Sequence, residues 1–225
     1  MITQAPRQLK DDLYEQFARI CKALGNAHRF ELLSILSQGE HSVDQLARET
    51  HMTTANTSQH LQHLRSSRLV LIRRAGVEIY YRLSAPMVFN LVQAVQDLAQ
   101  VRLAEVDRIV DELILSRSDL KVKSIDELEE ELDNPQLVIL DVRPQSEYKT
   151  DHITGAVSIP LDNLEQTYTQ LEKDKTIVVY CRDYYSRLSD EAARFLQTKD
   201  YDVYRLEYGF SRWKFLGKTT ESFAS

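Results

Sequence analysis

Short apolar runs alternate with segments of helical spacing throughout the second half of this chain. The runs cover residues 137–142, 157–159, 176–180 and 203–206, and the helical segments include 162–171 and 189–199. Strands that are apolar on both faces are typical of parallel sheets, because the helices that connect parallel strands cover both sides of the sheet. This half is therefore predicted to be an α/β domain with a parallel sheet.

Cys181 directly follows the strand predicted at 176–180 and precedes a polar loop and a helix. Ligands on parallel sheets bind at the carboxyl ends of the strands, and the N–H groups at a helix N-terminus stabilise a thiolate. We therefore expect Cys181 to be a sulfur nucleophile; the alternative is a buried small residue in an inactive domain. The predicted active-site loop comprises Arg182, Asp183, Tyr184, Tyr185, Ser186 and Arg187.

The charges near this thiol are mixed. Arg182, Arg187 and the helix N-terminus are expected to lower the pKa of Cys181 below its ordinary value of about 8.5. Asp183, Asp190 and Glu191 would oppose this if they pointed inward, but Asp190 and Glu191 are expected to decorate the first helical turn.

The first half predicts a mainly α winged helix-turn-helix. Helical spacing marks residues 14–23 and 29–36, and the capping-box sequence Ser42-Val43-Asp44-Gln45 opens a third helix. Thr53 or Thr54 caps a fourth helix that runs to about Ser67. Apolar runs on either side of Ala75–Glu78 then form a β-hairpin with glycine in its turn.

The fourth helix and the hairpin are predicted to bind DNA. Residues 1–118 carry a net charge of +1 and the remainder −7, and the segment 53–82 has five arginines against one acid. Such a basic patch suits a polyanion, whereas a solvated polar helix beside an ordinary hairpin is the alternative. The candidate DNA-binding residues are Thr54, Asn56, Thr57, Ser58, Gln59, His60, His63, Arg65, Arg68, Arg73 and Arg74, of which the short polar side chains would reach base edges and the arginines the phosphates.

Residues 84–116 are predicted to form one long helix with an apolar stripe. We expect a homodimer through the first helix and residues 86–115, which would present two recognition helices to a palindromic operator. The alternative is that this stripe packs only against the first helix of the same chain.

Composition and length support two domains. The chain has 225 residues and a net charge of −6, without an apolar run long enough for a membrane span or a signal peptide, so a cytoplasmic protein is expected. The predicted division is a DNA-binding and dimerisation domain at 1–117, a linker at 118–123 and a second domain at 124–217. Cys21 lies on a helical apolar stripe and is expected to be a buried, inert thiol.

The first half resembles the ArsR/SmtB family of winged-helix repressors. The resemblance is carried by residues 23–29, Ser58-Gln59-His60-Leu61, Leu69-Val70 and Tyr80-Tyr81-Arg82-Leu83. It implies dimeric operator binding and derepression by a signal. Many members bind metal through a Cys-rich motif, but the matching stretch at 41–46 has no cysteine, so we expect no metal and no cofactor.

The second half resembles a single-domain rhodanese from about Ser124 to Leu216. The matching motifs are Asp141-Val142-Arg143, Glu147-Tyr148, His152 to Ala156, Ile159-Pro160, Gly209-Phe210 and Trp213, with Cys181 at the position of the catalytic cysteine. The resemblance implies that Cys181 takes sulfane sulfur as a persulfide and passes it to a thiophilic acceptor. It also implies a structural role for Asp141, Arg143 and His152.

The loop after Cys181 departs from the usual rhodanese pattern. Tyr184 stands where glycine is expected, and Ser186 stands where a basic residue is common. The loop resembles the variant of fused ArsR–rhodanese regulators through Arg182, Tyr185, Leu188 and Ser189. Those proteins often have a second cysteine where this chain has Ser186, so a local disulfide relay is not expected.

Three functions follow from these patterns. The first is a transcriptional regulator, expected to be a repressor, whose rhodanese domain senses or carries sulfane sulfur or oxidation on Cys181. The second is an active sulfurtransferase with an autoregulatory DNA-binding domain. The third is a phosphatase or arsenate reductase, because Cys181 and Arg187 have the Cys-x5-Arg spacing of such enzymes.

Overall fold

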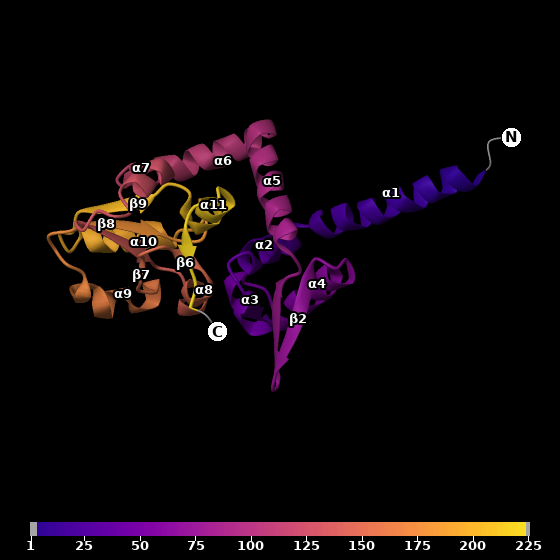
Figure 1. Cartoon of the computed structure of the whole chain (residues 1–225), viewed down its shortest axis with the longest axis horizontal. Helices are drawn as coiled ribbons and strands as arrows, with labels where there is room; N and C mark the ends of the chain where they lie inside the picture. Colours follow the sequence, from indigo (N-terminus) through magenta and orange to yellow (C-terminus); the bar gives the residue numbers. More distant parts are fainter. Residues whose placement is uncertain (1–3, 224–225) are drawn as a thin grey trace. The chain divides into compact units, whose positions relative to one another are not determined.

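A computed structural model describes residues 4–223, without the side chains of 4–6 and 113–115. The chain forms two compact units, Met1–Val95 and Gln96–Ser225 (Figure 1). None of the helices in the described residues is long and apolar enough to cross a membrane.

The first unit is a winged helix-turn-helix, as predicted. Its elements are α1 (Gln4–Leu24), α2 (Ala27–Leu36), β1 (His41–Ser42), α3 (Val43–Glu49), α4 (Thr54–Ser66), β2 (Val70–Ala75), β3 (Glu78–Leu83) and the start of α5 (Pro86–Arg102). The predicted caps are formed: Ser42 and Gln45 make a capping box, and the Thr53 hydroxyl accepts a hydrogen bond from Asn56 N. Gly76 adopts a positive φ of 61° in the turn of the wing.

The strand β1 was not predicted from the sequence. It is two residues long and pairs antiparallel with β3, so that the sheet has the order β1-β3-β2. The core beneath this sheet joins Leu32 and Leu33 of α2 to Leu61 and Leu64 of α4. This packing fixes α4 against the rest of the unit.

The single long helix predicted at 84–116 is two helices. α5 ends at Arg102 and α6 (Ala104–Leu115) begins after Leu103 (Figure 1). The charges at this point fit a helix boundary, because Arg102 stabilises the end of one helix dipole while Glu105 and Asp107 stabilise the start of the next. The apolar periodicity across the break concealed this signal.

The second unit contains the predicted parallel sheet. Its order is β4-β9-β8-β5-β7, and each neighbouring pair is parallel. The elements after α6 are β4 (Lys121–Lys123), α7 (Ile125–Glu130), β5 (Leu137–Asp141), α8 (Gln145–Thr150), β6 (His152–Ile153), β7 (Val157–Ser158), α9 (Leu161–Thr167), the 3₁₀ turn η1 (Tyr168–Gln170), β8 (Thr176–Tyr180), α10 (Leu188–Gln197), β9 (Val203–Leu206), α11 (Gly209–Phe215) and β10 (Thr220–Glu221). Residues 121–123, expected within a linker, thus form an edge strand of the sheet.

Alternate side chains of the strands β5, β8 and β9 enter two separate cores. Ile177 and Val179 of β8 pack with α9 and α10 on one face, whereas Val178 and Tyr180 pack with α7, α8 and α11 on the other. This burial on both faces explains the continuous apolar runs of the sequence.

A buried polar network lies at the carboxyl ends of β5 and β8. The Arg143 guanidinium pairs with Asp141, and both side chains are fully buried. The Tyr180 hydroxyl donates to Asp141 Oδ2 at 2.7 Å and accepts from Ile153 N at 3.2 Å. These contacts hold Asp141 and Arg143 inside the domain, which agrees with the structural role implied for them.

Replacing Tyr180 by Phe should therefore destabilise the second unit. The Ile153 N–H and the Asp141 carboxylate would each lose a buried partner, a loss of about 1–3 kcal/mol in the free energy of unfolding. Urea unfolding monitored by circular dichroism measures this change. The matched control is Tyr204→Phe, which removes a hydroxyl outside the network; an equal loss in both variants would contradict the assignment.

Candidate functional site

The thiol of Cys181 is buried directly after the end of β8. Its side chain lies in the core beneath α10 and only 2% of the residue is exposed. Three oxygen atoms surround Sγ: the Ser189 hydroxyl at 3.0 Å, the Asp183 carbonyl at 3.5 Å and the Ser186 carbonyl at 3.8 Å. Carbonyl oxygens accept hydrogen bonds, so this environment favours the protonated thiol.

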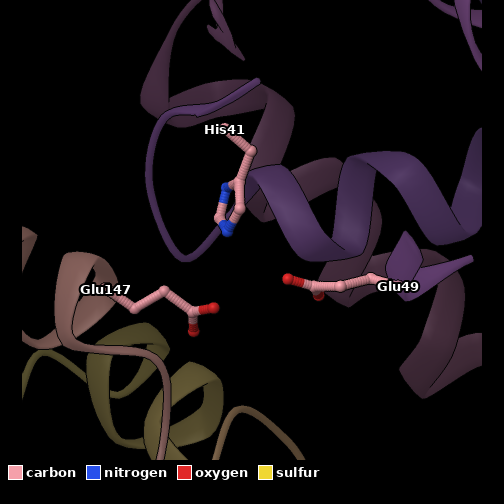
Figure 2. A group of neighbouring side chains, drawn as sticks. All are labelled: His41, Glu49 and Glu147. Carbon is pink, nitrogen blue, oxygen red and sulfur yellow. The ribbon is translucent and has the colours of Figure 1, made fainter. Parts of the chain in front are cut away.

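The pKa of Cys181 is raised, contrary to the sequence prediction. Burial is the main cause, and the negative charge of Asp183 adds to it, whereas the hydrogen bond from Ser189 acts in the opposite direction. The two arginines expected to lower this pKa are placed elsewhere. Arg182 forms an ion pair with Glu147 of α8 (Figure 2 shows Glu147), and Arg187 is exposed.

The loop N–H groups are occupied by a side chain of the loop itself. Asp183 Oδ1 accepts hydrogen bonds from Tyr185 N and Ser186 N, each at 2.9 Å. Burial raises the pKa of the Asp183 carboxyl group. Amide groups that could stabilise a thiolate or a bound oxyanion are thus already paired with a carboxylate.

Helix α11 fixes the start of the same loop. Phe210 N and Ser211 N donate to the carbonyl oxygens of Cys181 and Arg182, both at 2.8 Å. Gly209 makes this approach possible, because its φ is +73° and a Cβ there would lie 2.7 Å from the Cys181 carbonyl oxygen. The motif Gly209-Phe210 therefore positions the loop that carries the thiol.

Some residues near the thiol were missed or misplaced by sequence reasoning. The sequence marks Ser189 only as a match to a loop variant, yet its hydroxyl is the nearest of the three oxygen atoms to Sγ. Asp190 was expected on a solvated helical turn, but it is buried between Arg117 and Arg205. A serine and an acid in a first helical turn are too common for their sequence positions to reveal these contacts.

The candidate DNA-binding residues lie on α4, the turn that follows it and β2. Most are exposed, but Thr57 is fully buried and its hydroxyl donates to the Thr53 carbonyl, so its predicted place on the exposed face is wrong. Its position one turn before Leu61 puts it on the buried side of the helix. Exposed members of the set are Thr54, Asn56, Gln59, His63, Arg65, Arg68, Arg73 and Arg74, whereas Ser58 and His60 are half-buried.

Among the basic side chains of this set, Arg73 and His60 have partners within the unit. Arg73 forms an ion pair with Glu40 and its guanidinium stacks on the Tyr80 ring at 4.7 Å. The His60 ring lies 5.5 Å from that of His28, and burial together with His28 lowers the pKa of His60. Arg65, Arg68 and Arg74 are thus the arginines of the set without an ion pair among the described contacts.

The first helix exposes an apolar face. Leu9, Leu13, Tyr14 and Phe17 are each at least half exposed in the isolated chain. Cys21 on the same helix is exposed, which corrects its predicted burial. Large apolar side chains that cluster in this way mark interaction surfaces.

Comparison with known proteins identifies a family for each half of the chain. Residues 26–71 match the bacterial regulatory protein arsR family, and residues 124–215 match the rhodanese-like domain. The HTH-type transcriptional regulator Rv0324 of Mycobacterium tuberculosis is 35% identical over 208 residues, which cover 92% of this chain and 91% of that protein. This chain belongs to the ArsR family of transcriptional regulators.

Two partial matches cover the separate units of this ArsR-family regulator. The thiosulfate sulfurtransferase GlpE of Shewanella oneidensis is 32% identical over 97 residues, 43% of this chain and 94% of that enzyme. The solution structure of a homodimeric winged helix-turn-helix DNA-binding domain from Mycobacterium bovis is 40% identical, covers 42% of this chain and 87% of that one, and has a TM-score of 0.40. The two family matches given above show that the regulator combines an ArsR-type winged helix-turn-helix with a rhodanese-like domain.

Replacing Asp183 by Asn should make the thiol of this regulator more reactive near neutral pH. The change removes a negative charge that raises the pKa of Cys181, while the amide oxygen can still accept from Tyr185 N and Ser186 N. Because only the thiolate is nucleophilic, alkylation of Cys181 by iodoacetamide should accelerate as the pH rises through the pKa of the thiol. In Asp183→Asn this acceleration should occur at a lower pH than in the wild type.

The measurement is the alkylation rate of the peptide that carries Cys181 between pH 6 and 10, followed by mass spectrometry, because Cys21 is a second, exposed thiol. Asp126→Asn, an exposed acid on α7, is the matched control and should keep the wild-type profile. A profile for Asp183→Asn that equals the wild type would show that this carboxylate does not suppress the thiolate.

Proposed function

We propose that this regulator binds a palindromic operator as a homodimer and that sulfane sulfur or oxidation on Cys181 changes its affinity for DNA. The observation that carries the proposal is the buried Cys181 thiol at the carboxyl edge of the parallel sheet, hydrogen-bonded to Ser189 and close to the carbonyl groups of Asp183 and Ser186. Residues 41–46, where many family members bind metal, contain no cysteine. The group that responds to a chemical signal is therefore proposed to lie in the second unit. A cytoplasmic location accords with a DNA target.

The proposed reaction is transfer of one sulfur atom to the thiol. Cys181 first loses its proton to solvent, and its thiolate then attacks the outer sulfur of thiosulfate or a polysulfide. With thiosulfate, the new Sγ–S bond forms as the S–S bond of the donor breaks, and sulfite leaves with the electron pair. Ser189, 3.0 Å from Sγ, can donate a hydrogen bond to the sulfur anion at each stage.

The environment of the thiol supports slow sensing better than rapid turnover. Its pKa is raised and the loop N–H groups of Tyr185 and Ser186 are taken by Asp183, so a reactive thiolate is scarce at neutral pH. A modification that forms slowly and persists suits a signal. Sulfurtransferase activity remains the second candidate, because the likeness to GlpE spans nearly all of that enzyme.

The geometry gives little support to a phosphatase or arsenate reductase. Such an enzyme needs an arginine and free N–H groups around the oxyanion. Here Arg187 is exposed, and Asp183 would repel an oxyanion from the N–H groups that it occupies.

The dimer is proposed to form through α1 and residues 86–115. The side chains of residues 113–115 lie outside the described part of the chain. Besides the apolar face of α1, Leu98, Val101 and Ile109 are exposed in the isolated chain. A second copy that covered these side chains would bury them, and the two α4 helices could then reach successive half-sites.

Cys181→Ser should abolish the response to sulfur and leave basal DNA binding intact, because Cys181 lies outside the DNA-binding unit. The operator is first selected from a random-sequence DNA pool with the untreated protein. After treatment of wild type with thiosulfate or polysulfide, the peptide that carries Cys181 should gain about 32 Da and the affinity for that DNA should change, whereas the variant should show neither effect. Weak basal binding by the variant would argue against separate roles for the two units.

Peroxide provides the comparison with oxidation in the same assay. A gain of oxygen instead of sulfur, with the same change in affinity, would identify a redox sensor. Release of sulfite that continues over many turnovers with an acceptor thiol would favour the sulfurtransferase.

Phe17→Glu should weaken the dimer, because it places a charge in the proposed apolar interface. In the isolated chain 55% of the Phe17 surface is exposed, so the substitution leaves the fold of the single chain largely undisturbed. Sedimentation velocity should show a shift toward monomer, and affinity for the selected operator should fall at least tenfold. Val157→Glu makes the same kind of change on an exposed valine of β7 and should leave the dimer intact. Unchanged sedimentation of Phe17→Glu would exclude α1 from the interface.

A further inference from the structure

Arg117 joins the end of α6 to the loop that carries the thiol. It lies two residues after α6 ends at Leu115, yet only 4% of its side chain is exposed. Its Nε is 2.7 Å from Asp190 Oδ2, and its Nη1 and Nη2 donate to the carbonyl oxygens of Tyr184 at 2.9 Å and Ser186 at 3.4 Å. One guanidinium thus holds a helix and the loop together.

The surroundings of Arg117 make this contact rigid. Asp190 also pairs with Arg205 of β9 at 2.8 Å, so its carboxylate is fixed between two guanidinium groups. The Tyr184 ring lies over both, with ring centroids 5.3 Å from Arg117 Cζ and 5.4 Å from Arg205 Cζ. Tyr184 occupies the position where rhodaneses commonly have glycine, and its ring gives the loop a side-chain contact with Arg117.

Arg117 and the thiol share one atom of the loop. The Ser186 carbonyl oxygen is 3.8 Å from Cys181 Sγ and 3.4 Å from Arg117 Nη2. A second connection runs through α10, where Ser189 contacts Sγ and the next residue, Asp190, pairs with Arg117. A displacement of the loop by chemistry at Sγ therefore acts directly on the guanidinium.

A persulfide at Cys181 would require such a displacement. The added sulfur extends the side chain by about 2 Å and carries a negative charge. The site around Sγ is bounded by the carbonyl oxygens of Asp183 and Ser186 and is close to the Asp183 carboxylate. Because these groups repel an anion, the loop has to shift for the persulfide to be accommodated.

The segment after α6 has a second anchor that does not involve the loop. Arg194 of α10 donates to the Ser116 carbonyl at 2.6 Å and pairs with Asp119 at 2.8 Å. Its described hydrogen-bond partners lie outside residues 181–187. Arg194 thus supplies a matched control, since it fastens the same segment without contact with the loop.

We propose that Arg117 is a positioning residue that transmits the state of Cys181 to α6, and through the continuous chain of α6 and α5 to the DNA-binding unit. The proposal rests on the sulfur response proposed above. Sulfur on Cys181 moves the Ser186 carbonyl group, and the hydrogen bonds of Arg117 to the loop are then lost or rearranged. The segment that follows α6 is thereby held less firmly against the loop.

The test uses the full-length protein with thiosulfate as sulfur donor, for wild type, Arg117→Lys and Arg194→Gln. Lysine keeps the positive charge beside Asp190 but lacks the planar donors that reach two carbonyl groups. The mass of the peptide that carries Cys181 measures sulfur uptake, and affinity for the selected operator is measured before and after treatment. Wild type and Arg194→Gln should change affinity about tenfold. Arg117→Lys should gain the same mass with a change below about twofold.

The outcomes separate the two proposals. Wild type that gains no sulfur, or gains it with unchanged DNA affinity, contradicts the proposed function whatever Arg117 does. A responsive wild type with an equally responsive Arg117→Lys overturns the coupling proposal. So does a response lost equally in Arg194→Gln, or an Arg117→Lys protein that folds but cannot take up sulfur.

Hydrogen exchange on wild type keeps the proposal testable if Arg117→Lys does not fold. Amides of residues 116–120 and 184–188 should exchange faster together once Cys181 carries sulfur, as the shared contact is lost. Faster exchange confined to the loop would overturn the role of Arg117.

Discussion

The loop after Cys181 is held by hydrogen bonds from three parts of the chain, and the properties of the thiol depend on them. Helix α11 binds the carbonyl groups of Cys181 and Arg182, the Asp183 carboxylate binds two loop amides, and Arg117 binds two further carbonyl groups. Together they close the loop over a thiol in a low-dielectric core. Burial then raises the pKa of Cys181, because the charged form loses its hydration.

This arrangement differs from a thiol prepared for fast catalysis. A loop with free N–H groups would stabilise a thiolate and hold an anionic donor, whereas here an internal carboxylate occupies two of those groups. A buried, protonated thiol reacts slowly, because only the thiolate is nucleophilic. A slow reaction fits the sensing role proposed above better than rapid turnover.

Much of the fold could be predicted from the sequence because its signals are local. The capping box at Ser42, the cap at Thr53 and the glycine of the wing each act within a few residues, and the structure has all of them. The break at Leu103 was missed because the apolar periodicity continues across it. The strands β1, β6 and β10 were missed because each has only two residues and none stands in an apolar run of the kind that marks β7.

The sequence by itself determined the two fold classes, the position of Cys181 at a strand end and the candidate DNA-binding helix. Those features follow from periodicity and turn chemistry, which depend on neighbours along the chain. Only the tertiary structure decided the electrostatics of the site. Arg182 turns to Glu147, Asp190 is buried between Arg117 and Arg205, and Asp183 faces the loop amides. The physical reason is that charge interactions depend on distance and burial in space, and these partners lie up to 73 positions apart in the sequence.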